Sequence, residues 1–156
     1  MDELKDVMTQ RAIALHTRHV RDPFRSHEDH SSYYSQYSGY SSYAMGFVKF
    51  AAQEKYLFRW LYLDGKQFGT YQDDVLLSEI MTEYGYTEEI AQKLHQDMTY
   101  YSYGLAILAN TGHLNLTDEE LLVSFRREFT ALAAYYGVSP IPVKFRKHGK
   151  REFHLK

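Results

Sequence analysis

Two helix signals follow each other between Thr87 and Gly137, and together they constrain the fold more than any other feature of the chain. The first predicted helix has apolar residues at steps of three and four, which is the period of an α-helix with one buried face. These residues are Ile90, Leu94, Met98, Tyr101, Leu105 and Leu108. Asn110-Thr111-Gly112 predicts where this helix ends, because asparagine and glycine tolerate the left-handed backbone of a helix C-cap.

The second predicted helix begins at Thr117, where Thr117-Asp118-Glu119-Glu120 fits a capping box, and it runs to Gly137. Its apolar stripe is wide enough to meet more than one neighbour and comprises Leu121, Leu122, Phe125, Phe129, Leu132, Ala133 and Tyr136. Two interpretations are open. The pair forms a helical hairpin that closes the core of one chain, or it also faces a second copy across a two-fold axis as a four-helix interface.

Several stretches of the chain resemble the TetR family of transcriptional regulators. Together they span residues 1 to about 137 as a pattern of helix spacings, without a catalytic motif. The stretches are Met1 to Leu4, Phe47 to Ala51, Tyr56 to Leu61, Tyr103 to Ala106, Ala109 to Gly112 and Leu116 to Glu120.

The resemblance implies an all-α fold: a multi-helix orthogonal bundle of the TetR C-terminal-domain type, whose last two long helices form a helical hairpin for a dimeric four-helix interface. It implies that residues 1–137 are a helical ligand-binding and dimerisation domain. A family member also has an N-terminal helix-turn-helix, for which this chain has no room because an amphipathic helix begins almost at Met1. We therefore expect homodimers that reach DNA only through an N-terminal DNA-binding domain not present in this chain. The chain is then either an excised domain or a natural protein that lacks this DNA-binding domain, called the reader below.

The rest of the chain also predicts helices, at residues 2 to about 20, 55–63 and 75–84. A run rich in tyrosine and serine precedes residue 55, and its composition alone would equally fit a disordered linker. Helix is favoured because its rings step by three and four into a clearly apolar segment. These rings are Tyr33, Tyr37, Tyr40, Tyr43, Phe47 and Phe50.

If the resemblance holds, the helices beginning near residues 2, 32, 75 and 88 surround a cavity for a small aromatic or lipophilic effector. Aromatic rings and methionine sulfur suit such a ligand, although the same residues would equally fill a closed core. The candidate ligand-binding residues are Tyr40, Tyr43, Phe47, Trp60, Met81, Met98 and Tyr101. The residues expected at the dimer interface are Leu94, Leu105, Leu108, Leu122, Phe125, Phe129, Leu132 and Tyr136.

Composition limits the remaining classes of function. The net charge of -2 gives no overall electrostatic case for binding nucleic acid, and the chain has no cysteine for disulfides or thiolate zinc sites. The acidic N-terminus and the lack of a long apolar run predict a cytoplasmic protein without membrane association. Residues 138–156 are expected to be a basic tail, because from residue 143 onward it has six Lys or Arg against one Glu, a charge of +5. Three interpretations of this tail are open: it binds nucleic acid or acidic partners, it is a solvated tail, or it is an arm packed against the acidic body of its own dimer. Its alternating apolar residues would suit a short β-like arm.

Catalytic chemistry finds little support. His16, His19, His27 and His30 form two His-x-x-His pairs, but loop histidines are the simpler interpretation, and the spacing is not that of a zinc protease. No Glu-x-x-His pair of the kind that builds di-iron bundles occurs. We therefore expect no enzyme, no cofactor, and no catalytic or metal residues. The resemblance implies the effector-sensing and dimerisation domain of a TetR-like transcriptional regulator. The alternative is an interaction protein without a reader, which dimerises or pairs with a complete regulator and binds no small molecule.

Overall fold

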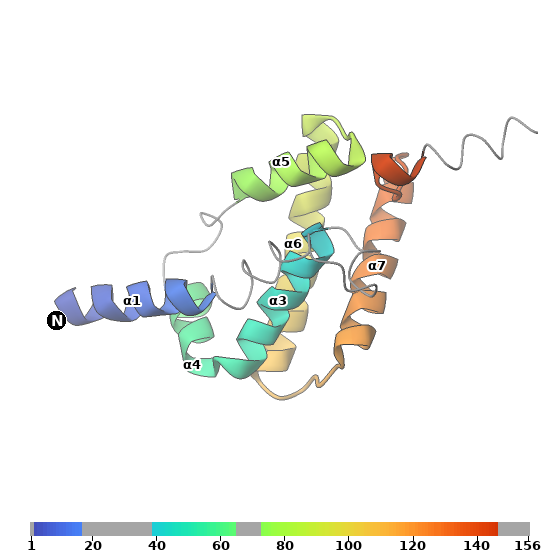
Figure 1. Ribbon diagram of the computed structural model, residues 1–156. Coiled ribbons are helices and arrows are strands. Elements are labelled where there is room, and N and C mark those ends of the chain that lie inside the picture. The colour runs from blue at the N-terminus through green and yellow to red at the C-terminus, as the bar shows by residue number, and fades with distance from the viewer. Residues whose placement is uncertain (1, 17–38, 65–72, 147–156) are drawn as a thin grey trace, which may run out of the picture.

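In the computed structural model, which describes residues 2–16, 39–64 and 73–146, every regular element is a helix (Figure 1). The all-α prediction is confirmed for these residues. None of the described helices is long and apolar enough to cross a membrane. The elements are α1 (Asp2–His16), α3 (Gly39–Gln53), α4 (Lys55–Phe58), the π-helix η3 (Arg59–Asp64), α5 (Asp73–Tyr84), α6 (Glu88–Asn110) and α7 (Asp118–Tyr135).

The start signals of α6 and α7 act as the sequence predicts. Thr87 precedes α6 and its hydroxyl accepts a hydrogen bond from the backbone N–H of Ile90. Thr117 and Glu120 form the full capping box, in which the Glu120 amide donates to the threonine hydroxyl at 3.2 Å and the Thr117 amide donates to the Glu120 carboxylate at 2.8 Å. Both ends are therefore set by local chemistry.

Glycines in the left-handed conformation end both long helices. Gly112 has a φ of 79° and Gly137 a φ of 72°. After Gly112, the amide of His113 donates to the carbonyl of Leu108; after Gly137, the amide of Val138 donates to the carbonyl of Ala133. Each bond spans five residues, as in a Schellman motif, so the last carbonyls of each helix are satisfied without a further helical turn.

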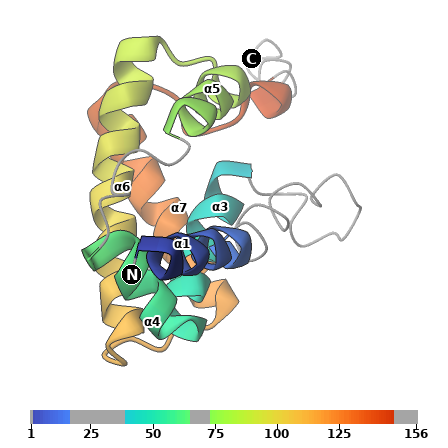
Figure 2. The same ribbon diagram turned by 90° about the vertical axis from the view of Figure 1, so that its left-hand side faces the viewer.

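The helices assemble around α3. Helix α3 packs against both α6 and α7, which lie side by side in opposite directions, and it thereby covers one side of that helix pair (Figures 1 and 2). Helix α5 lies across one end of the bundle and contacts α3 and α6. Helix α1 contacts η3 and projects away from the α6–α7 pair. The side of the pair that faces away from α3 is left without a described neighbour.

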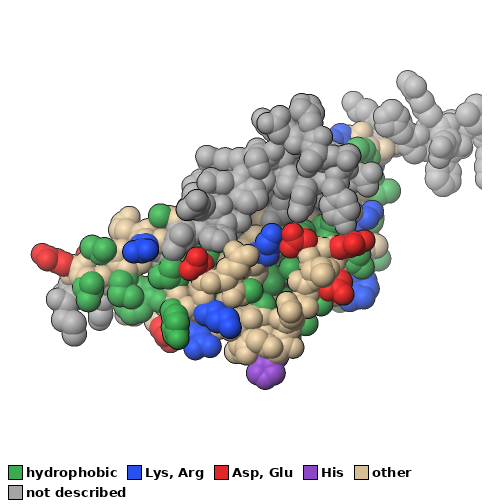
Figure 3. All heavy atoms as spheres, turned by 60° about the horizontal axis from the view of Figure 1, so that its bottom comes forward, with side chains coloured by type: hydrophobic (Ala, Val, Ile, Leu, Met, Phe, Trp, Pro, Cys, Tyr) green, Lys and Arg blue, Asp and Glu red, His purple; other side chains and the backbone are tan. Residues whose placement is uncertain are grey.

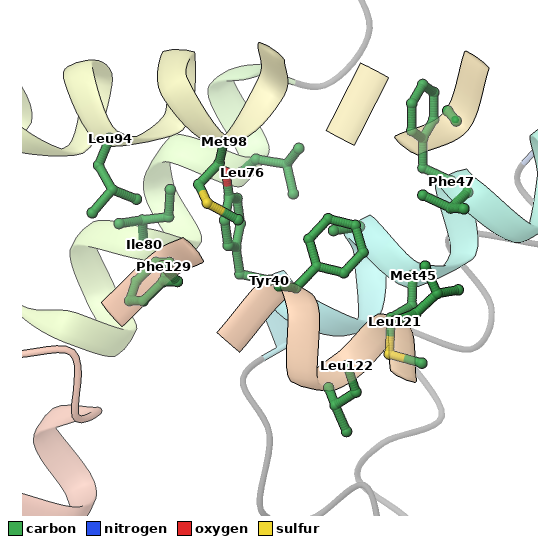
Figure 4. Packing of buried hydrophobic residues seen from close by; sticks show 14 of the residues in the cluster. Tyr40, Met45, Phe47, Leu76, Ile80, Leu94, Met98, Leu121, Leu122 and Phe129 are labelled. Carbon is green, nitrogen blue, oxygen red and sulfur yellow. The ribbon is translucent and has the colours of Figure 1, made fainter. Parts of the chain in front are cut away.

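Buried rings and branched side chains from α3 to α7 form one core. Figure 4 shows Ile80, Leu94 and Phe129 converging at one end of this core, while Phe47 lies at the other end. The largest fully buried side chains are Phe50, Phe58, Phe125, Leu61, Ile80, Leu94, Leu122 and Asn110. The last of these is polar, and its position needs a specific explanation.

Asn110, the last residue of α6, connects three elements. Its amide nitrogen donates to the carbonyls of Ala51 in α3 and Lys55 in α4, each at 3.0 Å. Its amide oxygen accepts from the Nε of Arg59 at 2.9 Å. The helix is interrupted between α3 and α4 at Glu54, whose backbone angles are not helical. The carbonyls of Ala51 and Lys55 therefore lie on either side of this interruption. Asn110 thus fastens the end of α6 to the bend that follows α3.

Several predicted boundaries change. The predicted short helix at 55–63 is one α-helical turn followed by a π-helix, and α3 (Gly39–Gln53) is the described part of the predicted tyrosine-rich helix. The earlier part of that helix, with Tyr33 and Tyr37, and the end of the predicted first helix lie outside the described residues. The expected β-like arm is wrong for residues 143–146, which form a helical turn, because the Phe145 amide donates to the carbonyl of Pro142 at 3.0 Å.

We expect Asn110→Ala to lower the free energy of unfolding by about 2–4 kcal/mol, because it leaves two carbonyls and a guanidinium beside a buried site without the amide. Urea unfolding followed by circular dichroism measures this. Asn115→Ala, at an exposed loop asparagine, is the control and should change stability by less than about 0.5 kcal/mol. Equal effects of the two substitutions would show that the Asn110 hydrogen bonds contribute nothing net.

Candidate functional site

The side of the α6–α7 pair that faces away from α3 has an open surface depression of about 550 Å³. We call this side the outer face and define it by Asp97, Tyr100, Tyr101, Gly104, Leu108, Glu128, Leu132 and Tyr135. Six of these residues line the depression, namely Asp97, Tyr100, Tyr101, Glu128, Leu132 and Tyr135. Volumes of this size are typical of small-molecule sites, although this one is shallow and open to solvent.

Contacts across the helix pair hold two of the rings. The hydroxyl of Tyr101 is hydrogen-bonded to the hydroxyl of Ser124, and its ring meets Phe125 edge-on at 5.9 Å between centroids. Tyr136 donates from its hydroxyl to the carboxylate of Asp97, and Tyr135 stands at 82° to the Tyr136 ring. The Asp97 hydrogen bond raises the pKa of Tyr136 to about 12, so that hydroxyl keeps its proton near neutral pH. The walls of the depression are therefore ordered by both helices.

Farther along α6, the outer face carries a glycine, Gly104, that no contact within the described part of the chain explains. Gly104 lies within the helix, is exposed, and a Cβ built on it would meet nothing within 4 Å. Glycine at such a position weakens a helix by roughly 1 kcal/mol relative to alanine. Leu108, one turn onward, is 44% exposed. A small residue beside an exposed leucine would allow another helix to approach closely.

The predicted ligand-binding residues do not meet at one place. Tyr40 and Met98 are buried, and the Tyr40 hydroxyl is 2.8 Å from Nδ1 of His95. Phe47 is buried within a separate group of rings, and its ring centroid lies 4.9 Å from that of Tyr62 and 5.0 Å from that of Tyr103. The remaining four are half-buried: Tyr43 on α3, Trp60 on η3, Met81 on α5, and Tyr101 on the outer face. A ligand among Tyr40, His95 and Met98 would not also touch the outer face.

The predicted dimer-interface residues divide between the core and the surface. Leu94, Leu122, Phe125 and Phe129 are buried within their own chain. Leu105, Leu132 and Tyr136 are half-buried and Leu108 is exposed. A second copy could therefore contact only the half-buried and exposed residues of this set, not the buried ones.

Sequence patterns pointed to neither His95 nor the exposed tyrosines. His95 precedes the predicted stripe residue Met98 by one turn and pairs with Tyr40, fifty-five positions away, which no local pattern reveals. Tyr100 and Tyr135, 61% and 80% exposed, fall outside the apolar stripes. The one sequence signal for Tyr100 and Tyr135 was that they are aromatic residues on the polar sides of two amphipathic helices, where exposed apolar surface can mark a binding site.

The two histidine pairs lie almost entirely outside the described residues. His19, His27 and His30 lie outside the described residues, as does the side chain of His16. Within residues 2–16, 39–64 and 73–146, no group of three or more metal-binding side chains occurs. The metal interpretation therefore gains no support from the described part of the chain.

The segment after α7 is fastened to the end of α5. Tyr86 donates from its hydroxyl to the carbonyl of Ser139 at 2.5 Å, and the Arg146 guanidinium donates to the carbonyl of Tyr84 at 2.7 Å. Burial raises the pKa of Glu83, on the same turn of α5, from 4.5 to about 7; the nearby Lys144 ammonium opposes this and Glu79 adds to it. Residues 139–146 thus contact the C-terminal end of α5 and the residues that follow it.

Searches with protein-family models found none that matches the chain, and comparisons with curated proteins and with solved structures found no match either.

We expect stability to fall as pH rises from about 5 to about 8, because Glu83 favours its protonated form in the folded state. A raised carboxyl pKa stabilises the fold fully below its unfolded value, and this contribution is lost as pH rises through about 7. Glu83→Gln should remove about 1 kcal/mol of that dependence, allowing for solvent screening of a half-buried group. Urea unfolding at several pH values measures this. Glu119→Gln, at an exposed residue, should leave the slope unchanged, and an unchanged slope in Glu83→Gln would contradict the assignment.

Proposed function

We propose that the chain is the effector-sensing and dimerisation domain of a TetR-like regulator, which reaches DNA only through a separate reader domain. The sequence resemblance motivates this proposal. The observation that carries it is the outer face, where Gly104 and the exposed Leu108 lie on a helix pair whose other side is covered by α3. A second copy of the same pair would complete a four-helix arrangement.

The cost of Gly104 supports a partner at this face. A helix-interior glycine allows a neighbour to approach where a side chain would collide with it, and the described part of this chain supplies no such neighbour. In a two-fold dimer, α6 of one copy would cross α6 of the other near this residue. Leu108 and Leu105 would then lose their water contact, which favours association.

Helix α1 is the element that we propose to transmit a ligand signal, as the predicted connecting helix. Its side chains Leu4 and Val7 are 62% and 63% exposed, and Figure 3 shows apolar side chains along this projecting end of the molecule. An exposed apolar stripe fits a helix that adjoins a further domain. A ligand would shift its position only by binding one arrangement of the helices more tightly than the other.

A second candidate function is the interaction protein that binds no small molecule. The observation that favours it is that two of the expected ligand-binding rings pack against other core rings: the Tyr40 ring centroid lies 6.1 Å from that of Phe129, and the Phe47 ring contacts the rings of Phe58, Tyr62 and Tyr103. Such a protein would dimerise or pair with a complete regulator, without a DNA-binding domain of its own.

We expect Gly104→Leu to weaken dimerisation by at least about tenfold, because overpacking a helix contact costs about 1–3 kcal/mol. The same change should leave the monomer as stable or more stable, since it replaces a helix-interior glycine in open space. Sedimentation equilibrium measures the first effect and urea unfolding at low protein concentration the second.

Ala52→Leu, at an exposed position of α3, is the matched control and should not change the dimer dissociation constant. A wild-type chain that stays monomeric at every soluble concentration contradicts the dimer, and a Gly104→Leu variant that dimerises normally places the interface elsewhere.

We expect some aromatic or lipophilic compounds to raise the melting temperature if the effector proposal holds. A ligand at 100 times its dissociation constant adds about 2.7 kcal/mol, which for a domain of this size corresponds to about 5–10 °C. Differential scanning fluorimetry of a compound panel measures the shift. Tyr40→Phe should reduce the shift for compounds bound beside His95, whereas Tyr100→Phe on the outer face should not. If no compound shifts the transition, the interaction protein is the better account.

A further inference from the structure

The depression of the outer face combines two kinds of chemistry that are found together where proteins bind organic cations. Three tyrosine rings, those of Tyr100, Tyr101 and Tyr135, line it together with the carboxylates of Asp97 and Glu128. The faces of aromatic rings attract cations through their quadrupole, and carboxylates add direct charge attraction. We propose that this depression is a binding site for a small organic cation of the quaternary ammonium or guanidinium class.

Among the described residues, no positively charged side chain lines the depression. Lys93, one turn before Asp97 on α6, is paired with Glu89 at 3.0 Å instead. Within the described residues, Glu128 has no hydrogen bond or ion pair, so its carboxylate is available to a ligand. The depression is therefore a negative, aromatic surface with room for a positive group.

The site is built in advance of any ligand. Tyr101 is fixed by its bond to Ser124 and its edge contact with Phe125, and Tyr100 accepts a hydrogen bond at its hydroxyl from Gln96 at 2.6 Å. The ring of Tyr135 packs edge-on against the ring of Tyr136, whose hydroxyl is hydrogen-bonded to the carboxylate of Asp97. Because these rings are held by other side chains, binding would lose little side-chain entropy.

Other ligand classes fit the depression less well. A neutral apolar ligand would cover the carboxylate of Glu128 without pairing it, and burying an unpaired carboxylate is unfavourable. A bare metal ion needs several oxygen ligands at close range, and the described residues contain no cluster of three metal-binding side chains. An organic cation satisfies both the rings and the carboxylates.

This inference goes beyond the proposed function and does not depend on it. The depression and the proposed dimer contact share the outer face, because Leu132 lines the depression and is also expected at the dimer interface. A second α6–α7 pair centred on Gly104 and Leu108 would therefore cover part of the depression. A Gly104→Leu chain, if monomeric, still contains every residue of the depression, so comparing it with the wild type separates cover by a second copy from a lack of binding.

The test compares choline with its neutral isostere 3,3-dimethyl-1-butanol in ¹H–¹⁵N NMR titrations at constant ionic strength, on the wild-type chain and on Gly104→Leu. Choline should produce saturable shifts at the amides of the depression, with at least about threefold tighter binding than the isostere. Tyr135→Leu and Glu128→Gln should each weaken choline binding by about two- to fivefold. Tyr56→Leu, which removes an equally exposed tyrosine from α4, should have no effect.

The proposal is overturned if choline gives no saturable shifts at these residues, or if the isostere binds equally well, which would indicate an apolar groove only. It is also overturned if Tyr56→Leu and Tyr135→Leu weaken binding alike. Failure of the dimer experiment leaves these outcomes unaffected, because they are measured as well on the Gly104→Leu chain.

Discussion

The buried amide of Asn110 is the interaction on which the arrangement of the helices depends. It bonds to carbonyls on both sides of the break between α3 and α4 and to Arg59 at the start of η3. The break turns the chain so that Phe58 and Leu61 enter the core from a direction that a continued α3 could not provide. A buried amide that is fully hydrogen-bonded specifies one geometry, because any other register would leave polar groups without partners in the core.

The helix pair could be predicted from the sequence because its signals are local. Thr87, Thr117, Gly112 and Gly137 each act on backbone groups within five residues of themselves, so reading the neighbouring letters suffices. The role of Asn110 could not be predicted in this way. In the sequence it belongs to a helix stop, but its partners Ala51 and Lys55 lie more than fifty positions earlier, and only the fold brings them together.

The same distinction explains which site residues could be found. An apolar stripe indicates that one face of a helix is buried, but not whether its own chain or a partner buries it. Phe125 and Phe129 thus satisfied the dimer pattern while packing inside their own chain. Tyr100 and Tyr135 lie outside the stripes and become recognisable only when α6 and α7 are placed side by side. The informative residue on this face is Gly104, because it lowers helix stability without any compensation from the described part of its own chain.

The core and the outer face are connected through α7. Phe129 contacts Tyr40 near His95, and Phe125, one turn earlier on the same helix, contacts Tyr101 at the outer face. A ligand that displaced Phe129 would therefore act on a helix that also positions the ring of Tyr101. Adjacency of this kind transmits a signal only if the packing has two arrangements that the ligand binds with different affinity. The hydrogen bond between Tyr101 and Ser124 joins α6 to α7 at this point, so a rotation of α7 about its axis would have to break it or move α6 as well. If the effector proposal holds, ligand binding in the core of one chain would alter the outer face, which contacts a second chain, through the contact between α6 and α7.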